Sequence, residues 1–276
     1  GRCHNHGDVD YLPGFEVADP ANCLAESGHA GVMVEGDVSQ FAGLRFALGR
    51  RFGRLVRGGR SRVELELGWV DPDGAAEKVG QALRRLRRHG RATARIRNRA
   101  DDIDLLKVDV DNCDCCFVEA LLATGLRPRL IHAEVHAFLP PPLAFRPSFR
   151  QDTSTVILSV REGAFHLHCS LSAYMALLQP QGYELSHLVG RDAVFVRNDL
   201  VPVFPIFQRH GGAKAIDDNA VAEAWRLGVR CHPTRPLNHE EYEYESYFGY
   251  DFRRWSDDTI PPSRRADFVR EHLRHV

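Results

Sequence analysis

The chain has 276 residues, a formal net charge of −1 and 43% hydrophobic residues, which is enough apolar material for a full core in one large domain or in a domain with an extension. The balanced charge gives no general reason to expect nucleic acid or an anionic membrane as a partner. No stretch of the sequence is apolar over the roughly 20 residues that a membrane-spanning helix needs.

The seven cysteines are sparse and odd in number, which is unlike a disulfide scaffold. We therefore expect reduced thiols and a cytoplasmic protein. The chain starts at Gly1, so a preceding targeting segment stays an open alternative.

The first part of the chain is predicted to alternate short strands with helices, after residues 1–18, which contain no convincing strand. The expected elements are a helix over 20–27, a buried strand over 31–35 that ends in an acid, a helix over 38–54, a half-exposed strand over 63–70, a turn over 71–74 and a helix over 75–89. The arginines at 84–99 are interpreted as a solvated helix face and its continuation, because no interleaved aromatic residues are present to stack nucleic-acid bases.

The stretch 104–142 is predicted to fold as strand, helix and strand, with Gly125 capping the helix. A unit of this length is a parallel crossover, and ligands of open parallel sheets bind beyond the carboxyl ends of the strands. The residues at those ends are polar: Asp109, Asp111, Glu134 and His136.

The last part of the chain is predicted to close the sheet and extend beyond it. Pro140 to Pro142 indicate an extended loop. The further elements are an irregular segment over 143–163, a helix from 169 to 178, a hairpin of strands 183–188 and 193–197 around Gly190, a helix over 220–227 and a terminal helix over 262–275.

Seven short segments follow the pattern of one known family. They are Asn5-His6-Gly7, residues 29–35, residues 105–114, Arg127-Pro128, Glu134-Val135, and the hairpin segments 182–185 and 192–196. Together they resemble the FkbM-type branch of the class I S-adenosylmethionine-dependent methyltransferases. The resemblance implies an α/β fold: a Rossmann-like, mostly parallel sheet with helices on both faces, a closing β-hairpin and a C-terminal helical extension. The methyltransferase-like domain would cover residues 1–199 and the extension residues 200–276.

The family's glycine-rich motif follows its first, central strand. This chain shows no strand there, and only Asn5-His6-Gly7 resembles the loop. The first strand is therefore expected to be either missing from the N-terminal end or degenerate.

The resemblance implies transfer of a methyl group from S-adenosylmethionine to an oxygen of a small-molecule or sugar acceptor. Glu35 would accept hydrogen bonds from the ribose hydroxyls, and Asp109 would hold the methionine ammonium group, orient the acceptor or act as a base. The expected cofactor-binding residues are Asn5, Gly7, Glu35, Asp37 and Asp109, and the expected catalytic residues are Asp109, Asp111 and His136.

No metal site is predicted, although Asp109, Asp111 and Glu134 could coordinate Mg²⁺ or Mn²⁺. A calcium-loop pattern starting at Asp109 fails, because its sixth position is Asp114 instead of glycine. The following residues suggest zinc only by residue type, and buried core thiols are the favoured interpretation: Cys113, Cys115, Cys116, His166, His168 and Cys169.

Two other functions stay open. Asp109-Val110-Asp111 is also the D-x-D pattern with which some glycosyltransferases hold a metal and a sugar nucleotide. A methyltransferase-like binding module without activity would agree with the poor glycine loop.

Overall fold

The computed structural model describes residues 29–51, 63–88, 103–110, 112–136, 139–149, 168–203, 218–225, 228, 254 and 259–273. These residues form an α/β structure that divides into two compact units, residues 1–102 with 123–126, and residues 103–122 with 127–276. The expected helix over 20–27 and the expected site residues Asn5, Gly7 and Asp111 lie outside the described residues. Within those residues, no helix combines the length and the apolar character needed to cross a bilayer.

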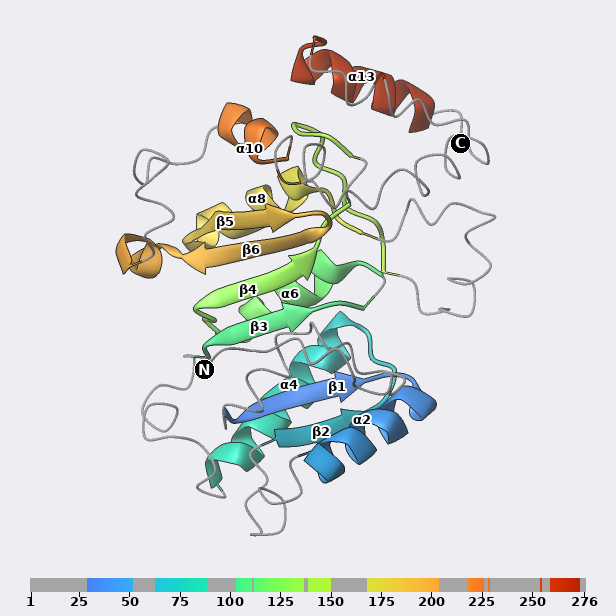
Figure 1. The fold of residues 1–276 in the computed structure, drawn as a ribbon, viewed down its shortest axis with the longest axis vertical. Helices are drawn as coiled ribbons and strands as arrows, with labels where there is room; N and C mark the ends of the chain where they lie inside the picture. Colours follow the sequence, from blue (N-terminus) through green and yellow to red (C-terminus); the bar gives the residue numbers. More distant parts are fainter. Residues whose placement is uncertain are drawn as a thin grey trace. The chain divides into compact units, whose positions relative to one another are not determined.

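The first unit contains a parallel pair of strands with two helices packed against it (Figure 1). The elements are β1 (Gly31–Glu35), α2 (Val38–Arg51), β2 (Val63–Leu67) and α4 (Pro72–Arg88). The predicted strand 31–35 and the start of the following helix are confirmed, but β1 is half-buried instead of buried, and Val34 is 37% exposed.

The start of α4 corrects one prediction. Residues 71–74 are the cap and first turn of the helix and not a separate turn. The Oδ1 atom of Asp71 accepts a hydrogen bond from the backbone N–H of Gly74 at 2.7 Å, and Pro72 occupies the first helical position. This is the standard N-terminal signal of a helix, since the cap satisfies an N–H that has no partner inside the helix.

Two basic side chains of α4 form contacts with β2 inside the first unit. Arg85 forms ion pairs with Glu66 and, at 3.7 Å, with Glu64, both on β2. Lys78 donates a hydrogen bond from Nζ to the carbonyl of Leu67 at 3.1 Å. These contacts pair part of the basic face of α4 with the acidic side chains of β2, so Arg85 is not part of the purely solvated face that the sequence predicts.

The second unit contains a four-stranded mixed sheet in the order β3-β4-β6-β5 (Figure 1). Its strands are β3 (Leu105–Val108), β4 (Leu130–Glu134), β5 (Tyr183–Val189) and β6 (Asp192–Arg197). The strands β3 and β4 are parallel and connected through α6 (Asp114–Ala123), which confirms the predicted crossover. The predicted hairpin is also confirmed: β5 and β6 are antiparallel, and β6 pairs with β4 in antiparallel register.

The remaining helices come directly before the hairpin or after it in the chain. They are α8 (Leu171–Leu178), the short 3₁₀ helices η2 (Gln179–Gln181) and η3 (Asn198–Val203), α10 (Asp218–Trp225) and α13 (Pro262–Leu273). Pro141 and Pro142 form a turn in which the N–H of Leu143 donates to the carbonyl of Pro140 at 3.1 Å, instead of the expected extended loop.

The core of the second unit forms where α6 and α8 contribute apolar side chains next to the sheet. Val118, Ile131 and Phe195 are fully buried, and the ring of Tyr174 stacks on Phe195 with centroids 5.6 Å apart. Gly125 has φ +90°, which agrees with the predicted helix cap, because this left-handed conformation is strained for other residues. The closely packed core holds the carboxyl ends of β3 and β4 in fixed register.

Candidate functional site

Two acids meet at the carboxyl ends of the parallel strands β3 and β4. Val108 is paired with Ala133, so Asp109 and Glu134 are the next residues of the two strands at the same edge of the sheet. The Oδ2 atom of Asp109 lies 2.9 Å from Nζ of Lys107, and its side chain is half-exposed. The side chain of Glu134 is more buried, with 22% exposed.

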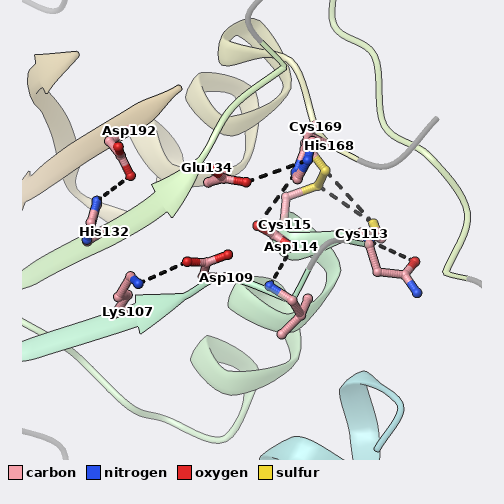
Figure 2. Close-up of polar contacts among 12 residues, drawn as sticks. Lys107, Asp109, Cys113, Asp114, Cys115, His132, Glu134, His168, Cys169 and Asp192 are labelled. Atoms are coloured by element: carbon pink, nitrogen blue, oxygen red, sulfur yellow. Dashed lines mark hydrogen bonds and ion pairs between the residues drawn. A yellow bond between two sulfur atoms is a disulfide. The ribbon is translucent and has the colours of Figure 1, made fainter. Parts of the chain in front are cut away.

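Asp114 and His168 join these acids and form with Glu134 what we call the acid–histidine cluster (Figure 2). Asp114 is fully buried at the first position of α6, and its Oδ1 atom accepts a long hydrogen bond from the N–H of Val110 at 3.4 Å. His168 lies between the two acids. Its Nδ1 atom is 3.9 Å from Oδ2 of Asp114, and its Nε2 atom is 3.5 Å from Oε2 of Glu134.

The charges of the acid–histidine cluster depend on one another. Burial raises the pKa of Glu134 to about 7, with the charge of His168 opposing and that of Asp109 adding to the increase. Burial also raises the pKa of Asp114, against the attraction of His168. Burial disfavours the charged form of His168, but Asp114 and Glu134 outweigh this effect and raise the pKa of the imidazole. A proton or a cation bound at any member therefore changes the charge preferred by the others.

The cysteines beside the cluster are paired, which contradicts the expectation of reduced thiols. Cys113 is bonded to Cys116, and Cys115 is bonded to Cys169, 54 residues away. The Sγ atom of Cys113 lies 3.9 Å from Sγ of Cys115 and from Sγ of Cys169. The sequence offered no sign of the long-range pair, because only the packing of the segment before α8 against α6 brings these sulfurs together. In this oxidised arrangement the four sulfurs are not thiolate ligands for zinc.

His136, an expected catalytic residue, is buried just beyond β4. It is 5% exposed, and its ring meets the edge of Phe145 with centroids 6.3 Å apart. Its backbone N–H donates to the carbonyl of Cys169 at 2.9 Å. This hydrogen bond joins the segment of His168 to the end of β4, and the catalytic role of His136 stays a prediction.

The expected cofactor residues of the first unit make local contacts. The Oε1 atom of Glu35 accepts a hydrogen bond from the N–H of Asp37 at 2.8 Å. Asp37 caps α2 by accepting from the N–H groups of Ser39 at 2.7 Å and Gln40 at 2.9 Å, and the hydroxyl of Ser39 holds the pKa of Asp37 below its usual value. Glu35 lies in the first unit and Asp109 in the second, so their convergence on one ligand stays a prediction.

Sequence reasoning did not select Asp114 or His168. Asp114 stands directly before Cys115 at the start of a helix, a position that by itself indicates only a favourable helix terminus. His168 directly precedes Cys169 and the Ser170 cap of α8, and no local pattern connects it with residues more than 30 positions earlier. The part of the site that the sequence does predict is the pair of acids at the strand ends, Asp109 and Glu134.

Comparisons with family models, with curated proteins and with solved structures gave no match for this chain. The geometry and chemistry of the acids and the histidine are therefore what indicate the role of this site.

Proposed function

We propose that the protein is an S-adenosylmethionine-dependent methyltransferase with a Rossmann-like fold, which transfers a methyl group to an oxygen of a small molecule or sugar. The observation that carries the proposal is the meeting of Asp109 and Glu134 at the carboxyl ends of two neighbouring parallel strands. This edge is where open parallel sheets bind their ligands. The antiparallel hairpin β5–β6 beside β4 also supports the proposal, because it agrees with the closing hairpin expected from the family resemblance.

In the proposed reaction the acceptor oxygen attacks the methyl carbon of the sulfonium. The carbon–sulfur bond breaks, its electron pair returns to sulfur, and the acceptor hydroxyl gives up its proton. Asp109 is the half-exposed carboxylate at the end of β3 that would receive this proton, with Lys107 orienting it through the ion pair at 2.9 Å. The sulfonium is already an activated donor, so the protein mainly supplies orientation.

Glu35 is proposed to bind the two ribose hydroxyls of the cofactor. A carboxylate suits this role because it accepts two hydrogen bonds from neighbouring donors, and such charge-assisted bonds are stronger than neutral ones. Its place at the end of β1 supports the assignment, since β1 is paired in parallel with β2 and ends at the same kind of edge.

Calorimetric titration of the full chain with S-adenosylhomocysteine tests this proposal. We expect saturable binding that weakens by about 10-fold or more in Glu35→Gln and in Asp109→Asn, because each substitution removes charge-assisted hydrogen bonds. Asp104→Asn is the matched control: Asp104 precedes β3 as Asp109 follows it, is also exposed, and is also paired with a cation, Arg129, at 2.9 Å.

Three results would count against the proposal. Absence of binding would support a binding module without the cofactor, and manganese-dependent binding of a sugar nucleotide would support the glycosyltransferase alternative. An effect of only one of the two substitutions would show that Glu35 and Asp109 do not share a ligand.

A further inference from the structure

We propose that Asp114, Glu134 and His168 bind one divalent transition-metal ion. The inference does not depend on the methyltransferase proposal. One ligand atom of each side chain can be chosen such that all three lie within 4.8 Å of one another. The three residues come from separate segments, the start of α6, the end of β4 and the residue before Cys169, and Figure 2 shows the carboxylates of Asp114 and Glu134 facing the ring of His168.

Two atoms of the acid–histidine cluster are buried without a hydrogen-bond partner among the described residues. They are Oδ2 of Asp114, whose side chain is completely buried, and Nδ1 of His168. Buried polar atoms are nearly always paired, so two such atoms facing each other indicate a binding position for an ion or a polar ligand. The separation of 3.9 Å is too long for a hydrogen bond. It does not exceed the separation of about 4.2 Å that two ligand atoms, each about 2.1 Å from one ion, can have at most.

The charges of the site suit a divalent cation once its ligands have lost their protons. Metal binding releases the protons of the ligands, and the two ionised carboxylates and the neutral imidazole then carry two negative charges, which a divalent ion balances and a water molecule does not. The charged residues that act on Asp114 are His168 and Asp109, which have opposite signs. Lys107 is already paired with Asp109.

The ligand set indicates the class of ion. One imidazole nitrogen with two carboxylate oxygens suits Zn²⁺, Mn²⁺ or Co²⁺, whereas Mg²⁺ and Ca²⁺ prefer oxygen ligands alone. Asp114 and His168 are buried, but 22% of the Glu134 side chain is exposed. The ion would therefore be reached by solvent or substrate from the side of Glu134, as in metal sites that keep an open position.

The surroundings hold the three ligands in place. The disulfide Cys115–Cys169 joins the residues that directly follow Asp114 and His168. The hydrogen bond from the N–H of His136 to the carbonyl of Cys169 attaches the same segment to the end of β4, next to Glu134. A site whose ligands are positioned before the ion arrives loses little freedom on binding, which favours affinity.

The test is a calorimetric titration of the full chain with ZnCl₂, MnCl₂ and MgCl₂, after treatment with chelator and without reductant. We expect one Zn²⁺ or Mn²⁺ ion per chain and much weaker binding of Mg²⁺. Asp114→Asn and His168→Ala should each weaken binding by about 100-fold or more, because a lost ligand costs more than a lost second-layer contact. Glu134→Gln, at the partly exposed ligand, gives an independent measurement if the variants at the buried positions do not fold.

Matched controls separate the site from general surface binding. Glu119→Gln changes an exposed acid of α6, and His187→Ala changes an exposed histidine of β5; both should bind as the unmodified chain does. The absorption spectrum with Co²⁺ identifies the ligand type, since thiolate ligands produce an intense charge-transfer band that nitrogen and oxygen ligands do not.

The proposal is overturned by an absence of saturable binding, by binding that survives both Asp114→Asn and His168→Ala, or by a thiolate band that assigns the ion to the cysteines. A failure of S-adenosylhomocysteine to bind, with metal binding retained, would refute the methyltransferase proposal and leave the metal site standing.

Discussion

The hydroxyl of Ser170 connects three parts of the second unit, and its removal should be unusually costly. Ser170 is fully buried and is the N-cap of α8. Its Oγ atom accepts hydrogen bonds from the N–H groups of Ala173 at 3.2 Å and Phe145 at 2.8 Å, and it donates to the carbonyl of Leu143 at 2.6 Å. One atom thus fastens the helix and the loop after β4 to the segment that carries His168.

The expected loss for Ser170→Ala follows from these three contacts. Loss of an N-cap hydroxyl costs about 1 kcal/mol. Loss of the two other bonds removes the hydroxyl from a part-buried N–H and from a buried carbonyl, at about 1 kcal/mol each. We expect a total decrease of about 2–4 kcal/mol in the free energy of unfolding, with the range reflecting that neighbouring contacts do not add simply.

Urea denaturation followed by circular dichroism measures this loss. With a slope of about 1–3 kcal/mol per molar urea, the midpoint should fall by about 1 M or more while the slope stays unchanged. Ser172→Ala is the matched control, because Ser172 lies in the first turn of the same helix and its hydroxyl has no hydrogen bond within the described residues. The reasoning would be refuted if the two variants differed by less than about 0.5 kcal/mol, the usual range of a neutral surface change.

Three further predictions follow from other contacts. The hydroxyl of Tyr183 donates a hydrogen bond to the carbonyl of Pro128 at 2.8 Å, and burial raises the pKa of Tyr183 to about 12. Tyr183→Phe should therefore lower the free energy of unfolding by about 1–2 kcal/mol at pH 8. Because the neutral phenol is the stabilised form, this difference should be full below pH 10 and decline as the pH rises toward about 12, and ionisation of this phenol near pH 10 in an ultraviolet titration would contradict it. Gly182 has φ +81°, so Gly182→Ala should lower the free energy of unfolding by about 1 kcal/mol. Gly80→Ala inside α4 should raise it by about 0.5–1 kcal/mol, because alanine favours the helix and the added Cβ meets only Arg84 at an ordinary 3.5 Å. Equal effects of the two substitutions in chemical denaturation would refute the assignment of these two backbone conformations. The double variant Cys115→Ser/Cys169→Ser should lower zinc affinity by about 10-fold, because it releases the segment of His168 from that of Asp114. The control variant Cys113→Ser/Cys116→Ser should change zinc affinity little, because its disulfide spans only three positions. Equal zinc affinities of the two double variants in calorimetry would show that the disulfide Cys115–Cys169 does not support the metal site.

Local physical chemistry in the sequence determined most of the described elements. Apolar runs flanked by glycine, proline and acids marked β1, β3 and β4, a helix was expected over 169–178, where α8 forms, and the turn at Gly190 marked the hairpin. Each of these signals depends only on residues within or next to the element, so the element can be predicted without knowledge of the fold. The same local information was misread at Asp71, where a cap followed by proline also resembles a turn.

The sequence also placed Asp109 and Glu134 at strand ends, because a parallel crossover puts such ends on one edge. Only the tertiary structure decided that Asp114 and His168 complete the group, and that Cys115 pairs with Cys169. These contacts join segments about fifty residues apart in the chain. Local sequence patterns do not show which distant side chains will be buried together. The consequence is physical: burial leaves an oxygen of Asp114 without a hydrogen-bond partner among the described residues, and folding brings one ligand atom each of Asp114, Glu134 and His168 within 4.8 Å of one another, and those two facts turn ordinary acids into a candidate metal site.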